Sequence, residues 1–342
     1  MTDVDVIVIG GGPIGLAAAI EARLAGLSVV VYEPRPAPVD KACGEGLMPG
    51  AVLALDRLGI HPAGRPFAGI RYLDGALAVE HRFRRGAGLG VRRTELSRAI
   101  AQRVGSLGVD VVPERVGTIR SDERGVSLPD GRRASWLFGC DGLHSAVRRQ
   151  LHLDRRPRQV ARYGLRRHYQ VAPWTDLVEV HWTPTGEIYV TPVGEHSVGV
   201  AVLGPRGTDY DAVLSHAGVL GDRLTGASVS TELRGAGPLR QPTKNRTHGR
   251  VLLVGDAAGY VDALTGEGIR LGLAQARAAV AAVVAGRPAD YERDWRRLSR
   301  AYRLVTTVLV GAAVRPAVRR RIVPLAVRLP RVYDALVETI AR

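Results

Sequence analysis

Three glycines near the start of the chain have the spacing of a nucleotide-binding turn. Gly10, Gly12 and Gly15 form a Gly-x-Gly-x-x-Gly pattern directly after the apolar run 4–9. In such a turn the first glycine permits a sharp bend from strand to helix. The second lets the backbone approach a pyrophosphate, and the third allows the helix to pack closely on the strand. The N–H groups at the start of the helix would then face the phosphates.

An acidic residue follows at the distance that this chemistry needs. Glu33 ends the second apolar run, 27–32, and stands 18 residues after Gly15. A carboxylate at this place can accept hydrogen bonds from both hydroxyls of an adenosine ribose. Together with the glycines it predicts a dinucleotide site, but it does not distinguish FAD from NAD.

Two later strand-turn segments add carboxylates. The apolar run 250–254 leads to Asp256, and Gly268 and Ile269 then open a predicted helix. These residues suit a ribityl chain and the anionic edge of a reduced flavin ring. In the same way, a short apolar run at 136–139 leads to Asp141 and Gly142, ahead of another predicted helix. The pairing of ADP-side and ribityl-side motifs favours FAD.

The elements that position these motifs predict an α/β fold, in which a doubly wound Rossmann-like domain is interrupted by an antiparallel β-rich substrate domain and followed by a helical C-terminus. Continuous β-branched runs are typical of strands buried on both faces of a parallel sheet, whereas alternating segments indicate antiparallel strands. The first part of the cofactor domain is predicted at 1–160, and it includes strands near 67–85 that belong to the substrate domain. The substrate domain is predicted at 161–245. The chain is then predicted to return to the cofactor domain at 246–290 and to end in a helical region at 291–342.

The order and spacing of these three motifs resemble the FAD-dependent group A monooxygenases and their relatives, the geranylgeranyl reductases. The resemblance covers about residues 1–290 and implies one non-covalent FAD. It implies that NAD(P)H reduces the flavin in passing, since no second Gly-x-Gly-x-x-Gly is present. The implied reaction is hydroxylation of an aromatic or polyketide-like small molecule through a flavin C4a-hydroperoxide. Arg93, at the start of a predicted helix, resembles the family's flavin-reaching arginine better than Arg92 does.

One loop resembles the reductase branch of this family more than the monooxygenase branch. Lys41-Ala42-Cys43-Gly44 is similar to the Lys-x-Cys-Gly loop of the geranylgeranyl reductase-like proteins, in which the loop approaches the isoalloxazine. The alternative function is therefore reduction of C=C bonds in a prenyl or lipid substrate. Cys43 has a second interpretation as a small buried hydrophobic residue.

The predicted site thus combines residues from the motifs and from this resemblance; no catalytic base is assigned, and no metal site is expected. The predicted cofactor-binding residues are Gly10, Gly12, Pro13, Ile14, Gly15, Glu33, Ala42, Cys43, Gly44, Arg93, Val116, Asp141, Gly142, Asp256, Gly268 and Ile269. Trp174, Trp182 and Tyr189 are expected either to line an aromatic pocket or to form the core of the β-rich domain. Asp154, in an arginine-rich stretch, is expected to be solvated.

The composition adds a strong positive charge. Of 342 residues, 48 are lysine or arginine and 33 are acidic, giving a net charge of +15, and 41 are glycine. Such a charge attracts anions, but no nucleic-acid motif is present, so nucleic acid is not an expected partner. We expect a cytoplasmic protein without a signal peptide. The basic apolar segment 314–342 either packs over the flavin domain or lies at the inner membrane surface as a peripheral contact.

Overall fold

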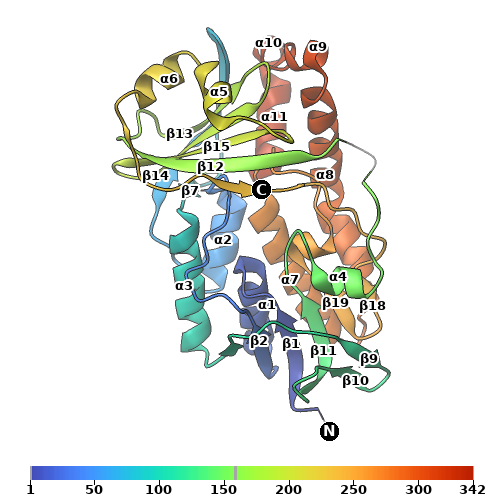
Figure 1. Cartoon of the computed structure of the whole chain (residues 1–342). Helices are drawn as coiled ribbons and strands as arrows, with labels where there is room; N and C mark the ends of the chain where they lie inside the picture. The colour runs from blue at the N-terminus through green and yellow to red at the C-terminus, as the bar shows by residue number, and fades with distance from the viewer. Residues whose placement is uncertain (1, 158–159, 342) are drawn as a thin grey trace.

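The computed structural model describes residues 2–157 and 160–341. Two large sheets lie at opposite ends of an elongated molecule, and long helices run between them (Figure 1). The N-terminus lies at the end of the first sheet, and the last helices cover the second (Figure 1). The expected α/β class, with an inserted β-rich part and a helical C-terminus, is confirmed.

The first sheet is the predicted doubly wound core. Its order is β18-β19-β11-β1-β2-β8, with the β9-β10 hairpin attached to β11, and the pairings from β19 to β8 are parallel. Because the sheet is covered on both faces, its central strands are continuous valine, isoleucine and leucine runs. The strands are β1 (Val4–Ile9), β2 (Val29–Tyr32), β8 (Asp110–Val112), β9 (Arg120–Asp122), β10 (Gly125–Ser127), β11 (Arg133–Gly139), β18 (Thr247–His248) and β19 (Val251–Leu253).

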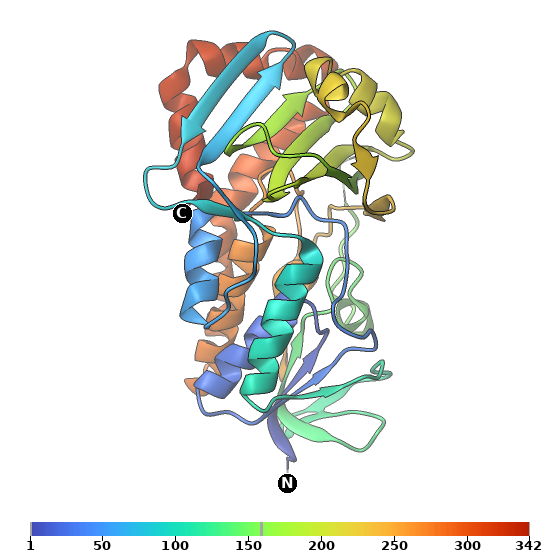
Figure 2. The same ribbon diagram turned by 90° about the vertical axis from the view of Figure 1, so that its left-hand side faces the viewer.

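Helices pack on this sheet through small side chains. The alanine-rich α1 lies against both neighbouring helices, α3 and α7, and α8 packs outside α7. Figure 2 shows these helices side by side beneath the second sheet. The helices of this part are α1 (Pro13–Leu24), α2 (Pro49–Arg57), α3 (Arg93–Ser106), α4 (Ala146–Gln150), the 3-10 turn η1 (Gly255–Ala258), α7 (Gly268–Val284) and α8 (Asp290–Ala313).

The second sheet is the β-rich insertion. Its order is β16-β12-β15-β14-β13-β5-β6, with β17 paired to β12. The strands are β5 (Gly69–Asp74), β6 (Leu77–Arg82), β12 (Arg162–Gln170), β13 (Leu177–Trp182), β14 (Glu187–Gly194), β15 (Ser197–Pro205), β16 (Ser228–Val229) and β17 (Arg234–Ala236). The predicted strands near 67–85 do join this sheet, but β5 pairs with β13 in parallel. The sheet is therefore not wholly antiparallel, because β5 reaches it through a long crossover rather than a hairpin.

Smaller elements close the fold. A three-stranded sheet, β3 (Gly46–Leu47), β7 (Gly88–Gly90) and β4 (Arg65–Phe67), joins the two parts. Two short helices, α5 (Tyr210–Ser215) and α6 (Val219–Leu224), pack on β12, β14 and β15 through a separate apolar cluster. The last helices are α9 (Pro316–Arg319), α10 (Ile322–Arg328) and α11 (Pro330–Ala341).

The C-terminal helices pack on the substrate sheet. Val323, Tyr333 and Val337 are buried in one apolar cluster with Ile70 of β5 and Trp182 of β13. The expectation that this segment packs over the flavin domain is therefore wrong. The helices take this place because β5 and β6 present an uncovered apolar face that α10 and α11 bury.

Candidate active site

One large cavity lies between the two sheets, with a volume of about 510 Å³. The carboxyl ends of β1 and β11 open onto it, as expected for the ligand site of a doubly wound sheet. Every residue predicted to bind the cofactor lines this cavity except Gly15. Segments that are far apart in the sequence therefore meet at one site.

The glycine-rich turn is built for close approach of an anion. Gly10 has a φ of 107°, and a Cβ there would lie 2.6 Å from the Cys140 carbonyl oxygen. A Cβ on Gly15 would lie 1.8 Å from the Gly10 oxygen, so Gly15 serves helix–strand packing. A Cβ on Gly12 would meet nothing within 4 Å. The backbone at Gly12 is thus open on the cavity side.

The start of α1 offers hydrogen-bond donors there. Pro13 has no N–H, and the first intrahelical bond of the turn runs from the Leu16 N–H to the Gly12 oxygen, at 3.0 Å. The N–H groups of Ile14 and Gly15 consequently have no acceptor within the helix. With the helix dipole they form a phosphate site.

Glu33 is held in its ionised form beside this turn. Its carboxylate accepts a 2.9 Å hydrogen bond from the Gly11 N–H and a 2.7 Å hydrogen bond from Arg35 Nε. Burial alone would raise the pKa of Glu33, but the bonds from Arg35 and Gly11 outweigh it and lower the pKa. An ionised carboxylate is the form that accepts both ribose hydroxyls.

Asp141 has one oxygen occupied and one without a partner. Its Oδ2 accepts from the N–H groups of Ala146 and Val147, at 2.6 and 3.1 Å, and so caps α4. Its Oδ1 is buried and has no hydrogen-bond partner among the described residues. Since Asp141 lines the cavity, this oxygen is placed to accept a bond from a bound molecule.

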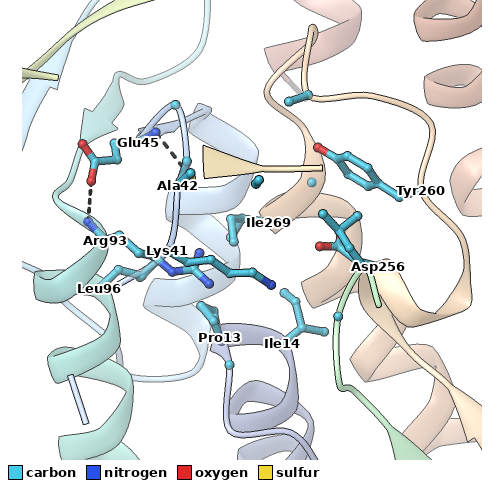
Figure 3. A pocket seen from close by; sticks show the side chains of 18 of the residues that line it. Pro13, Ile14, Lys41, Ala42, Glu45, Arg93, Leu96, Asp256, Tyr260 and Ile269 are labelled. Atoms are coloured by element: carbon cyan, nitrogen blue, oxygen red, sulfur yellow. Dashed lines mark hydrogen bonds between the residues drawn. The ribbon is translucent and has the colours of Figure 1, made fainter. Parts of the chain in front are cut away.

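The middle of the cavity places two cations opposite Asp256. Lys41 extends across it towards Asp256, with Arg93 beside it (Figure 3). Burial lowers the pKa of Lys41, whereas the charge of Asp256 opposes that shift. Burial raises the pKa of Asp256, opposed by Lys41 and Arg93. Arg93 Nε is buried and has no acceptor in the part of the chain that the structure describes. These groups suit a phosphate and polyhydroxy chain.

The start of α7 is placed as predicted. The helix begins at Gly268, and both Gly268 and Ile269 line the cavity. Tyr260 stands next to them, and a Cβ on Gly268 would lie 3.4 Å from its ring. The N-terminal end of a 17-residue helix therefore faces the cavity, where its dipole favours a negative charge.

The loop with Cys43 is fixed by a buried polar network that sequence reasoning missed. Glu45 has a φ of 60°. Its Oε1 accepts a 2.8 Å bond from the Arg93 N–H, and its Oε2 lies 2.6 Å from His168 Nε2. Arg166 Nη1 lies 3.2 Å from His168 Nδ1. The same Nδ1 lies 2.9 Å from the Thr231 hydroxyl oxygen, so both ring nitrogens of His168 have polar partners.

No sequence signal marks this network, because β12 also carries Arg162, Arg167 and Gln170. Arg166 and His168 are each 1% exposed on β12. Arg166 also pairs with Asp40, and the Thr191 hydroxyl donates to the Gly44 oxygen at 2.8 Å. The loop that lines the cavity is thus tied to the second sheet on both sides of Cys43.

The far wall of the cavity is apolar. It comes from the second sheet, the segment 260–265 and the end of α11, and includes the phenols of Tyr72 and Tyr189. Burial raises the pKa of both tyrosines, which keeps them neutral. The remaining side chains of this wall are Ile70, Val178, Val180, Thr191, Ala201, Leu203, Leu239, Ala263, Leu264 and Ile340.

The three aromatic residues considered as pocket candidates are Trp174, Trp182 and Tyr189, and they do not all lie at the cavity. Tyr189 lines the cavity and donates to the Leu264 oxygen at 2.9 Å. Trp182 is 4% exposed and packs on Tyr72 in the core. Trp174 Nε1 donates to Glu179 at 3.1 Å. The pocket interpretation therefore holds for Tyr189 alone.

Asp154 is exposed to solvent as expected, with 42% of its side chain accessible, but it also has an ion-pair partner. It forms a 2.8 Å ion pair with Arg148 Nε, whose side chain is 1% exposed. Arg148 also donates to the Leu143 and Ala257 oxygens, at 2.8 and 3.1 Å. Arg148 therefore joins the Asp141 turn to η1, and Asp154 neutralises a buried charge.

These features together fit FAD. The phosphate end has open N–H groups, the ribose end has an ionised carboxylate, and the middle has the unpartnered Asp141 Oδ1 and Arg93 Nε. FAD would lie along the motif side, with its ring towards the loop at Cys43 and the start of α7. The apolar wall remains for a substrate.

Comparison with known proteins agrees with this geometry. A family model described as an FAD binding domain matches residues 3–207. A menaquinone reductase of Mycolicibacterium smegmatis is 30% identical over 87% of this chain and 80% of its own length. A rifampicin monooxygenase of Rhodococcus hoagii is 33% identical, but the match covers 42% of this chain and 33% of the monooxygenase. The probable FAD-dependent monooxygenase PqsL from Pseudomonas aeruginosa superimposes with a TM-score of 0.76, at 19% identity, over 93% of this chain and 98% of PqsL.

These findings define a flavoprotein built on the fold of the flavin-dependent monooxygenases. The chain belongs to the FAD binding domain family, and it is an FAD-dependent oxidoreductase of the monooxygenase group. The menaquinone reductase shares most of its length with this chain, whereas the rifampicin monooxygenase shares about a third of its length with it.

Proposed function

We propose that this protein is an NAD(P)H-dependent monooxygenase that hydroxylates an apolar aromatic or polyketide-like small molecule. The observation that carries the apolar substrate class is the apolar wall facing the FAD motifs across one cavity, and the choice of hydroxylation is supported by the monooxygenases among the relatives. When bound, FAD supplies the electrons and the activation of dioxygen. The substrate is proposed here from the chemistry of the wall and from the monooxygenases among the relatives.

The chain's own part is to hold the ring and keep water out. Glu45 and Thr191 fix the loop on one side of the proposed ring position, and α7 presents its N-terminus on another. The side chains from the second sheet carry no ionised group, so a substrate there is held by apolar contact and by phenol hydrogen bonds. A dry site of this kind protects reactive intermediates from water.

NAD(P)H is the proposed reductant. The sequence has one Gly-x-Gly-x-x-Gly pattern, at Gly10–Gly15, and FAD would occupy it. We therefore propose that the nicotinamide nucleotide has no domain of its own and reduces the flavin from the open side of the cavity.

A second candidate is reduction of C=C bonds in a prenyl chain. It is favoured by the Lys41–Gly44 loop, which resembles that of the geranylgeranyl reductases and does line the cavity. The long match to a menaquinone reductase also supports it. An apolar wall suits a prenyl chain as well as an aromatic ring, so the wall does not separate the two reactions.

Oxygen uptake separates them. Purified enzyme with NAD(P)H should consume O₂ faster when an alkyl-substituted phenol is added, and a phenol bearing a carboxylate should have little effect because the wall holds no cation. The Ala201→Leu variant should lose this stimulation by filling the cavity, while the matched Ala335→Leu variant, changed at an exposed site on α11, should keep it. Anaerobic reoxidation of reduced flavin by a prenyl substrate without a quinone ring, with recovery of the saturated chain and no stimulated O₂ uptake, would instead establish the reductase.

A further inference from the structure

Residues 314–332, here called the tail surface, carry an unusual group of exposed apolar side chains. Leu325 is 54% exposed and Val332 is 63% exposed, although the same helices bury other apolar residues. The exposed large apolar side chains of this segment are Val314, Val318, Leu325, Val327, Leu329 and Val332. They stand at the end of the molecule formed by α9, α10 and the start of α11 (Figure 1).

The same segment is strongly basic. Arg315, Arg320, Arg321, Arg328 and Arg331 are all exposed. No aspartate or glutamate occurs between Asp294 and Asp334, so no acidic side chain of the segment balances them. Exposed apolar and basic side chains on one short-helix surface are typical of a helix that lies in a lipid interface.

The inner side of this segment is already used for packing. Val323 is fully buried and Tyr333 is 3% exposed. Arg319 points inward, where it donates to the Thr183 oxygen at 2.6 Å and pairs with Glu187. The apolar residues exposed to solvent therefore form a second face of the segment, separate from the face that packs on the rest of the protein.

The segment consists of short helices, α9, α10 and the start of α11. No single helix in residues 2–157 and 160–341 is long and apolar enough to span a bilayer. Helix α8 reaches that criterion only together with the 316–328 stretch, from which it is bent by 107°. A bend of this size, with α10 packed on β6, suits a helix that rests on an interface.

We propose that the tail surface docks the protein on an anionic lipid bilayer. The charge complementarity selects this occupant over a neutral membrane, since each arginine near an anionic surface strengthens binding roughly fivefold. Helix α11 connects this surface to the active site: Arg331 and Val332 lie at its start, and Ile340 lines the cavity. Docking would hold a lipid-soluble substrate near the cavity, whichever of the two flavin reactions takes place.

Co-sedimentation of the FAD-loaded protein with vesicles tests the proposal. Wild type should pellet with phosphatidylglycerol–phosphatidylcholine vesicles at low salt and remain in the supernatant with pure phosphatidylcholine. Raising the salt should release it, because salt shortens the Debye length. The Arg320→Gln/Arg321→Gln variant should bind at least tenfold more weakly. The matched Arg120→Gln/Arg124→Gln variant removes the same charge from exposed sites on and next to β9 and should bind like wild type.

A second pair of variants tests how much the exposed apolar side chains contribute to vesicle binding. Leu325→Ser/Val332→Ser should weaken vesicle binding severalfold, whereas Leu53→Ser, at a 69% exposed position on α2, should not. Flavin absorbance and thermal unfolding, unchanged in all variants, show that the fold is kept. The proposal is overturned if wild type stays in the supernatant with anionic vesicles, or if the two arginine pairs have equal effects. It is also overturned if Leu325 and Val332 instead support a concentration-dependent dimer without lipid binding.

Discussion

Arg319, in the C-terminal segment, forms a 2.8 Å ion pair with Glu187, a fully buried carboxylate on β14. Arg162 pairs with the same carboxylate from β12. Burial raises the pKa of Glu187, and the two arginines oppose that rise. The pair therefore attaches the tail to the substrate sheet and neutralises a charge that would otherwise be costly to bury.

Replacing Arg319 with glutamine should destabilise the fold. Glu187 would lose one of its two cations, and we expect the free energy of unfolding to fall by about 1–3 kcal/mol. Arg320→Gln, at the next and exposed position, should change it by less than about 0.5 kcal/mol. Urea unfolding of both variants measures the difference, and equal stabilities would show that the ion pair contributes nothing.

The free energy of unfolding that is lost in Arg319→Gln should depend on pH. A carboxyl group whose pKa is raised on folding adds stability below its unfolded pKa, and this stability disappears as the pH rises through the folded pKa. Without Arg319 the pKa of Glu187 should rise further. The variant should therefore lose less stability relative to wild type near pH 5 than near pH 8, which urea unfolding at the two pH values can measure.

Asp256→Ala should weaken FAD binding. The carboxylate faces Lys41 across the cavity, so its removal takes an acceptor from the ribityl region and leaves the lysine unbalanced (Figure 3). A loss of about 1–3 kcal/mol corresponds to roughly 5- to 150-fold in affinity. Titration of the apoprotein with FAD, followed by flavin fluorescence, gives both dissociation constants.

The control for Asp256→Ala is an exposed aspartate that does not pair with a buried arginine. Asp154 is unsuitable because it pairs with the buried Arg148. Asp56, with a side chain 67% exposed on α2, is suitable. Asp56→Ala should bind FAD like wild type, whereas Asp154→Ala should lower the melting temperature. If Asp256→Ala and Asp56→Ala bind FAD equally, the assigned role of Asp256 is wrong.

Local patterns predicted much of the cofactor domain because its signals are short-range. Strand Val4–Ile9 was predicted with its observed bounds, and α1 and α7 were predicted to within a few residues. The β9-β10 hairpin was missed because its first strand, Arg120–Asp122, is fully exposed and has no apolar alternation. The parallel β5–β13 pairing was also missed, since it depends on a contact between distant segments.

The candidate active site shows the same difference between features set by local sequence and features set by contacts between distant segments. Motif glycines and carboxylates could be placed from their spacing, but Lys41 opposite Asp256 and the Glu45–His168 contact depend on tertiary structure. The ion pair between Arg148 and Asp154 was missed for a related reason. In a chain with many arginines, sequence does not show which of them are buried and need a carboxylate.

Glu45→Ala should loosen the loop beside the proposed flavin ring. It removes the acceptor of the partly buried Arg93 N–H and the partner of the buried His168 Nε2, so we expect a loss of about 1–3 kcal/mol in the free energy of unfolding. The bound flavin should also show a changed visible absorbance spectrum, because its surroundings change. Glu195→Ala, at an exposed position, should leave both the stability and the spectrum unchanged. An unaltered spectrum in Glu45→Ala would show that the loop does not contact the ring.

The two cysteines should differ sharply in reactivity. Both line the cavity, but Cys43 is half-buried, whereas Cys140 is 8% exposed and burial raises the pKa of its thiol. Since the thiolate is the reactive form, a disulfide reagent such as DTNB should modify one thiol of the native apoprotein, and that thiol should be absent in Cys43→Ser. FAD placed as proposed covers the loop, so saturating FAD should slow the modification at least several-fold, while NAD⁺ alone should protect less. Two thiols reacting at equal rates would contradict the burial of Cys140, and modification of Cys43 at the same rate with and without FAD would place the flavin away from this loop.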